Sequence, residues 1–171
     1  MNRRAALGLT TTVLAGVALS TGDAMAQQSS LNEQLVGTWT MVLCEAVQQD
    51  GTKGPLVMGS DPAGQYIFTG NGHFSFQAVA DLPKFASNSR IKTTAEENKA
   101  VVEGLIASYG TYTVNDADKT IGIHIERSSF PNLNGTDGKR IITGLSADEM
   151  KYINPSRTGG GSINCSYKRA K

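Results

Sequence analysis

Three residues with acid–base or charged side chains, His124, Glu126 and Arg140, are the first candidates for chemistry in this chain. His124 and Glu126 alternate with isoleucines in the segment Thr120–Arg127, so both point to one face of a predicted strand. If the isoleucines pack beneath a helix, that face lines the interior, and Arg140 on the next strand can pair with Glu126. Such a cluster would bind a carboxylate or shift the pKa of the histidine for acid–base work. The alternative is that these side chains face solvent.

Aromatic side chains supply the candidates for an apolar lining. Tyr66 with Phe68, and Phe74 with Phe76, recur at every second position, so each pair shares one strand face. Pairs of this kind are more often plain core than contacts to a ligand. The full set of candidate ligand-binding residues is His124, Glu126, Arg140, Tyr66, Phe76, Tyr112, Tyr152 and Asn154.

The chain lacks the sequence motifs of common active sites. Its two histidines, His73 and His124, are far apart, and no paired histidine or cysteine motif suggests a metal site. No Gly-x-Ser-x-Gly elbow, dinucleotide-binding glycine motif or phosphate-binding loop is present. We therefore predict no metal and no cofactor, and a binding protein is favoured over an enzyme.

The elements that must position these residues are short strands. Period-two alternation separated by turn residues predicts eight of them, at 36–47, 65–69, 73–79, 109–114, 120–127, 139–145, 149–154 and 162–169. Thr94 and Glu97 form a capping-box pattern, which predicts one α-helix that runs to Ala107. This helix falls between the third and fourth strands, and we expect it to cover the wall or one end of the sheet. Short connections favour an all-β, antiparallel, up-and-down barrel over a sandwich.

The first 26 residues have the pattern of an export signal that is removed. Asn2-Arg3-Arg4 is basic, Ala5–Leu19 is apolar and uncharged, and Ala24-Met25-Ala26 fits a cleavage site. The arginine pair is compatible with the twin-arginine route. The alternative, a membrane anchor, is disfavoured because the apolar run is short. We predict a periplasmic or secreted protein with one domain, 27–171, and no stable membrane insertion after the signal is removed.

The net charge limits the classes of binding partner, and the cysteine content allows one disulfide. The formal net charge is +1, and the chain has no basic stripe, which argues against nucleic acid and anionic membranes as partners. The two cysteines, Cys44 and Cys165, fall in the first and last predicted strands, which are neighbours in a closed barrel. In an exported protein they can form one disulfide. Two buried free thiols are the alternative. We expect a monomer or a weak dimer.

The strand-opening motif Gly37-Thr38-Trp39, with an ordered series of later motifs, resembles a bacterial lipocalin-like domain family with a calycin-type barrel. The likeness covers nearly all of the chain after the signal and implies a barrel with an interior cavity. In lipocalins the glycine lets the chain turn in under the barrel floor, the tryptophan plugs that floor, and a basic residue of the last strand packs across it. Arg169 is the matching residue here. The later motifs are Pro83-Lys84-Phe85-Ala86-Ser87, Glu96-Glu97-Asn98-Lys99, Tyr109-Gly110-Thr111-Tyr112, His124-Ile125-Glu126, Ser128-Ser129-Phe130-Pro131-Asn132, Gly135-Thr136-Asp137, Lys139-Arg140 and Tyr167-Lys168-Arg169.

Three functions are compatible with these observations. The leading one is an exported binding protein that holds a small, apolar or amphipathic molecule inside the barrel. The second is a barrel enzyme of the cyclase, isomerase or lyase type, which needs His124 and Glu126 to face one cavity. The third is a protein-binding envelope module, which needs an exposed apolar patch, at 82–85 or at 130–131.

Overall fold

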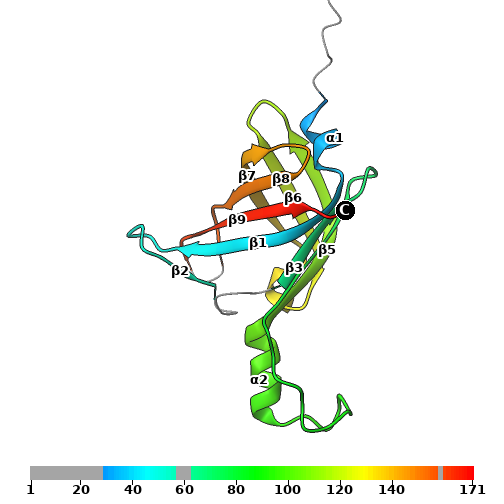
Figure 1. Cartoon of the computed structure of the whole chain (residues 1–171), viewed down its shortest axis with the longest axis vertical. Helices are drawn as coiled ribbons and strands as arrows, with labels where there is room; N and C mark the ends of the chain where they lie inside the picture. The colour runs from blue at the N-terminus through cyan, green and yellow to red at the C-terminus, as the bar shows by residue number, and fades with distance from the viewer. Residues whose placement is uncertain (1–28, 57–62, 158–159) are drawn as a thin grey trace, which may run out of the picture.

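The computed structural model describes residues 29–56, 63–157 and 160–171, and most of them belong to strands (Figure 1). The strands are β1 (Gly37–Val47), β2 (Lys53–Pro55), β3 (Ala63–Phe68), β4 (His73–Val79), β5 (Leu105–Asn115), β6 (Thr120–Ser128), β7 (Thr136–Leu145), β8 (Glu149–Asn154) and β9 (Ser162–Arg169). The helical elements are α1 (Leu31–Leu35), α2 (Ala95–Gly104) and a 3-10 turn, η1 (Pro131–Leu133). In this part of the chain no helix is long and apolar enough to cross a membrane.

The strands form one closed antiparallel barrel. Neighbours in the sheet follow the order β1, β3, β4, β5, β6, β7, β8, β9, and β9 pairs with β1 to close the ring. The short strand β2 pairs with Glu45–Val47, the end of β1, and stands beside the ring of eight. The predicted all-β, up-and-down barrel is confirmed. The predicted export signal, residues 1–26, lies outside the described residues.

Period-two alternation places one face of each barrel strand in the core. On β6, Ile121, Ile123 and Ile125 are buried, whereas His124 between them is exposed. The same alternation on β3 buries Tyr66 and Phe68. The isoleucines therefore pack into the barrel itself, and the alternate positions form its outer wall.

The helix α1 and Trp39 close one end of the barrel. Ser30 and Glu33 form a capping box at the start of α1, and Leu35 at its end is fully buried. The indole Nε1 of Trp39 donates a hydrogen bond to the carbonyl oxygen of Leu35, at 2.8 Å. The predicted elements do not include α1, although Ser30 and Glu33 have the same spacing that predicted α2.

Arg169 fastens this closed end from the last strand. Its guanidinium carbon lies 4.1 Å from the centre of the Trp39 ring, so it packs across the tryptophan as the resemblance implied. It donates to the carbonyl oxygens of Val36, at 2.8 Å, and Gln34, at 2.6 Å. Gly37 makes this possible, because its φ is +136° and a Cβ there would lie 2.5 Å from Nη1 of Arg169.

A disulfide joins the two strands that close the ring. Cys44 on β1 and Cys165 on β9 are bonded, and they are register partners in the β1–β9 pair. Both cysteines are buried against the core. The sequence left open a disulfide or two buried free thiols, and the structure contains the disulfide.

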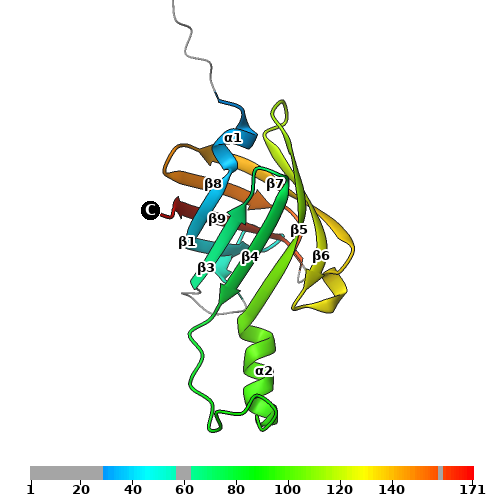
Figure 2. The same ribbon diagram turned by 90° about the vertical axis from the view of Figure 1, so that its right-hand side faces the viewer.

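The helix α2 differs from the prediction in position and contacts. It lies between β4 and β5, because β2 adds a strand before it, and it ends at Gly104 because Leu105 and Ile106 pair with β4 instead. The helix and the segment 80–94 project from the barrel at the end opposite α1 (Figures 1 and 2). Val102 of this helix is an apolar residue, yet it is 73% exposed. The expectation that this helix covers the wall or an end of the barrel is therefore wrong.

The projecting segment is held to the helix by the capping carboxylate. Glu97 accepts hydrogen bonds from the backbone N–H groups of Thr94 and Ala86, each at 2.8 Å. These two bonds lower the pKa of the Glu97 carboxyl. Leu82, expected in an exposed patch, is half-buried and packs towards Gly104, whereas Phe130 is exposed.

Replacing Arg169 tests the closed end. Arg169→Lys keeps the charge but loses the planar group that packs on Trp39 and donates to several carbonyls at once. We expect the free energy of unfolding in urea to fall by about 2–4 kcal/mol. Lys168→Ala, next to it on the outer wall, is the control and should stay within about 0.5 kcal/mol. Wild-type stability of Arg169→Lys would show that the closed end does not depend on this contact.

Removing the disulfide tests the closure of the ring. The bond joins residues separated by 121 positions, so the Cys44→Ala/Cys165→Ala double variant should lose about 3–5 kcal/mol of unfolding free energy in the chain-entropy account. Urea denaturation of the variant, and of the wild type with and without reductant, measures this loss. Equal midpoints for all three samples would contradict the expectation.

Candidate functional site

Arg140 is a charged residue that points into the barrel. It lies on β7 on the same strand face as the buried Ile142, and its register partner on β6 is the buried Ile121. The residue two positions before it, Gly138, has no side chain, and a Cβ there would lie 3.4 Å from Nη1 of Arg140. Alternation on β7 therefore directs the guanidinium inward, and Gly138 leaves room for it.

The contacts of Arg140 are polar and aromatic but not ionic. Nη1 donates to Oδ1 of Asn154, at 3.1 Å, and to the carbonyl oxygen of Lys139, at 3.0 Å. The guanidinium carbon lies 5.8 Å from the centre of the Tyr152 ring. Within the described residues, no carboxylate lies at ion-pair distance from Arg140, and its buried Nε has no acceptor. The barrel thus contains a positive charge without a counter-charge among these residues.

Three tyrosines surround the interior that Arg140 faces. The rings of Tyr152 and Tyr167 are stacked with centroids 5.6 Å apart, and their hydroxyl oxygens are 3.0 Å apart. Tyr66 packs edge-on against Tyr152 at a centroid distance of 6.2 Å. Tyr167 was not among the predicted ligand residues, although it shares strand parity with Cys165, which would have placed it inside.

Burial controls the protonation of two of these hydroxyls. It raises the pKa of Tyr66 and Tyr167 well above the ordinary value of 10.0, and the positive charge of Arg140 opposes part of this rise. Both hydroxyls are protonated at neutral pH, as in any tyrosine, and burial keeps them protonated into the alkaline range. In that form each keeps a hydrogen that it can donate to an anion.

Most predicted ligand residues face the interior, but several serve as core. Tyr66 is in ring contact with Phe76, at a centroid distance of 5.1 Å. The hydroxyl of Tyr112 donates to the carbonyl oxygen of Thr69, at 2.8 Å, and so holds the turn between β3 and β4. These aromatic side chains pack on one another towards the closed end. Arg140, Asn154 and Tyr152 remain together as the polar group of the interior.

The prediction that His124 faces the interior is wrong. Its side chain is 48% exposed, and Nδ1 lies 2.8 Å from Oδ1 of Asp137 on the outer wall. The prediction required the isoleucines of β6 to pack beneath a helix. Because α2 projects away from the barrel, they fill the interior instead, and His124 must point outward.

The predicted pair of Glu126 with Arg140 is also wrong. Arg140 lies opposite Ile121, five residues before Glu126, which is roughly 16 Å along the strand. Glu126 is the extra residue of a β-bulge, since Gly110 pairs with Ile125 and Tyr109 pairs with Arg127. His124 and Glu126 therefore do not form the shared acid–base site that the enzyme alternative required. No group of three possible metal-ligating side chains occurs in the described ranges.

The family model for a lipocalin-like domain matches residues 36–162. The chain belongs to the lipocalin-like domain family. Among solved structures, a lipocalin-like protein from Bacteroides uniformis is 15% identical, with 80% of this chain and 99% of that chain covered and a TM-score of 0.45. Another protein from Bacteroides uniformis is 19% identical, with 82% and 92% covered and a TM-score of 0.43. A redesigned β-barrel is 17% identical, with 84% and 100% covered and a TM-score of 0.44. No curated protein sequence matches this chain.

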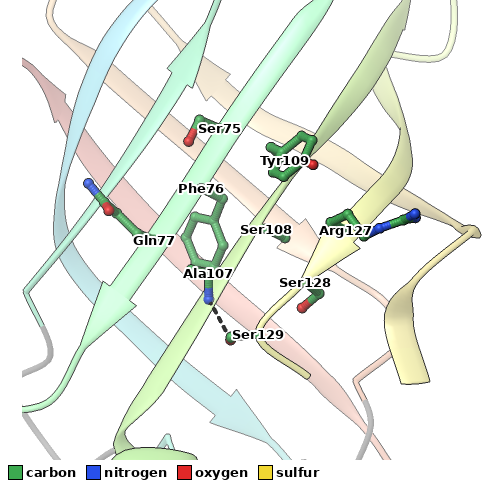
Figure 3. A pocket seen from close by; sticks show the side chains of 9 residues that line it. All are labelled: Ser75, Phe76, Gln77, Ala107, Ser108, Tyr109, Arg127, Ser128 and Ser129. Carbon is green, nitrogen blue, oxygen red and sulfur yellow. Dashed lines mark hydrogen bonds between the residues drawn. The ribbon is translucent and has the colours of Figure 1, made fainter. Parts of the chain in front are cut away.

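The bulge gives this lipocalin-like barrel a feature on its outer wall. Strict alternation from Ile125 would point Arg127 inward, but the extra residue reverses the parity, so Arg127 stands beside Tyr109 outside. Gly110 is required there, because a Cβ at this position would lie 2.0 Å from the carbonyl oxygen of His124. An open hollow of about 230 Å³ lies around these side chains (Figure 3). Sequence reasoning missed Arg127 because no pattern in β6 marks the bulge.

The buried tyrosines of this lipocalin-like protein predict a loss of stability at high pH. In the unfolded chain Tyr66 and Tyr167 ionise near their ordinary pKa, whereas in the folded state they must stay protonated. Their contribution to the free energy of unfolding is complete well below pH 10. It is lost as the pH rises towards the pKa values of the folded state. We expect the free energy of unfolding to fall by about 1 kcal/mol for each tyrosine between pH 10 and 11, measured by urea denaturation. Tyr66→Phe should reduce this slope, and an unchanged slope would contradict the assignment.

Proposed function

We propose that this lipocalin-like protein is an exported binding protein that holds a small, partly apolar anion inside the barrel, with Arg140 as the anchor. The observation that carries the proposal is the inward guanidinium, which has no counter-charge among the described residues and an Nε without an acceptor. A partly buried charge without a partner costs free energy, and a ligand carboxylate would offset that cost.

The surroundings of Arg140 fit the polar end of such a ligand. A guanidinium can hold a carboxylate through two parallel N–H bonds, which favours this group over a neutral one. The hydroxyls of Tyr66 and Tyr167 stay protonated at neutral pH and are within electrostatic reach of Arg140. Asn154 positions the guanidinium through its Nη1, so that the Nε side is left for the ligand.

Small inward residues fit the apolar end of the ligand. Ala46, Gly64 and Ala78 lie at the ends of β1, β3 and β4 that are farthest from α1, and they leave more room there than the aromatic rings towards α1 do. Met41 lies against Gly64, since its Cε would be 2.9 Å from a Cβ placed there. A methionine side chain is flexible enough to yield space to an aliphatic tail. We infer a short tail that lies between Arg140 and the end of the barrel from which α2 projects.

Export is the second part of the proposal. It rests on the basic, apolar and Ala24-Met25-Ala26 segments at the amino terminus. The disulfide between Cys44 and Cys165 fits an oxidising compartment such as the periplasm.

Thermal unfolding with matched ligands tests the binding site. Decanoate and decanamide have the same tail, but only decanoate is charged at pH 7.5. We expect decanoate to raise the Tm by several degrees more than decanamide, since a ligand at 100 times its Kd adds about 2.7 kcal/mol. In Arg140→Met the two ligands should act equally, while the Tm without ligand stays at or above that of the wild type.

Arg127→Met is the matched control, because it removes an arginine from the outer wall of the same barrel. It should keep the preference for decanoate. If Arg140→Met has a lower Tm but still prefers decanoate to decanamide, Arg140 has a structural role and does not bind the ligand. Failure of fatty acids and amides from six to fourteen carbons to raise the Tm would rule out an aliphatic ligand in the barrel.

A further inference from the structure

The outer wall over β4, β5 and β6 carries an assembled group of side chains that the barrel interior does not use. Tyr109, at the centre of this group, is 52% exposed, and Arg127 lies opposite it on β6. The neighbouring outward residues are small or polar, so they leave the hollow around the Tyr109 ring open (Figure 3). They are Ser75 and Gln77 on β4, Ala107 on β5 and Ser129 after β6.

Arg127 is free to contact a ligand. Its Nη1 donates to the carbonyl oxygen of Glu126, at 2.8 Å, and within the described ranges it forms no ion pair. The hydroxyl of Ser129 already accepts a hydrogen bond from the backbone N–H of Ala107, at 2.9 Å. This bond fixes one side of the hollow, whereas the guanidinium on the other side keeps most of its donors available.

A second hollow of about 300 Å³ continues along β5 towards the closed end of the barrel. Its rim includes Thr111, Thr113 and the pair of His124 with Asp137, and Gly122 opens its centre because it has no side chain. The two hollows follow β5 from Ala107 to Thr113, which is roughly 20 Å. Together they form a shallow, elongated surface that is open to solvent.

The chemistry of this surface fits a ligand rich in hydroxyl groups. Hydroxyl, amide, guanidinium, imidazole and carboxylate groups can each donate to or accept from such a ligand. The exposed ring of Tyr109 offers a flat apolar face on which the C–H side of a sugar ring can pack. β5 is paired on both sides, so an extended peptide finds no free backbone there to add to as a strand. Recognition must therefore come from side chains.

We propose that this outer wall is a binding site for an oligosaccharide, with Tyr109 as the stacking platform and Arg127 and Gln77 as hydrogen-bonding groups. The site is separate from the proposed site at Arg140, because its side chains point away from the interior. Either site can therefore fail its test without affecting the other.

Titration followed by amide NMR tests the proposal. The probes are chitohexaose, cellohexaose and maltohexaose, each added to the isotope-labelled protein up to millimolar concentration. We expect at least one of them to shift the amide signals of Tyr109, Thr111 and Arg127. The signals of Tyr152 and Tyr167 inside the barrel should not move.

Variants identify the groups responsible. Tyr109→Ala should raise the dissociation constant about tenfold or more, whereas Tyr109→Phe should stay within about threefold, because the ring carries the contact. Arg127→Ala should weaken binding through the loss of hydrogen bonds. The matched control is Leu43→Ala, which removes an exposed apolar side chain from β1, far from β5 in the ring.

Two results would overturn the proposal. The first is that none of the three hexasaccharides shifts signals near Tyr109, or that the shifts persist unchanged in Tyr109→Ala. The second is that a mixture of unstructured peptides shifts these signals while the sugars do not, which would make the wall a peptide-binding surface. Spectra of each variant without ligand show whether it is folded.

Discussion

The barrel depends on one cation at its closed end. Arg169 comes from the last strand, yet it packs on the tryptophan of the first strand and donates to the carbonyl groups at the end of α1. Those carbonyls belong to the turn of chain where helix becomes strand, and the helix cannot satisfy them itself. A single planar side chain thus joins α1, β1 and β9 and pairs with half-buried carbonyl groups that the helix leaves unpaired. Glycine is required at position 37 because of the approach of Arg169, and not because of the strand that begins there.

The two inward arginines of the barrel show opposite situations. The N–H groups of Arg169 meet carbonyl oxygens, and its flat face meets an indole ring, so its charge is well accommodated. Arg140 is held by Asn154 and lies near Tyr152, but its Nε has no acceptor in the part of the chain that the structure describes. Evolution can keep a costly charge only where it gives a benefit that a well-packed apolar side chain would not. This difference separates an arginine whose donors are satisfied by the fold from one that keeps a donor without a partner among the described residues.

Sequence reasoning predicted the order of the strands well, because alternation and turn residues are local signals. It placed the eight barrel strands and the disulfide partners in their positions. It failed for His124, since the inward face of β6 depends on what the isoleucines pack against, and α2 stands away from the sheet. It could not place Arg127, because the bulge that turns this side chain outward arises from pairing with β5. Arg140 points into the interior, but Glu126, its expected partner, lies far along the strand.

The pairing of the first strand with the last has a consequence for how the chain reaches this structure. Val36 and Arg169, which meet at the closed end, are 133 residues apart in sequence. Contacts of such separation form slowly, because a long loop must be ordered before they contribute free energy. Until β9 arrives, β1 presents an unpaired edge to other chains, and the hydrophobic side of the sheet is open. Conditions that delay the pairing of β9 with β1 therefore prolong the time in which this edge and this hydrophobic face are exposed, and they favour aggregation before the barrel is closed.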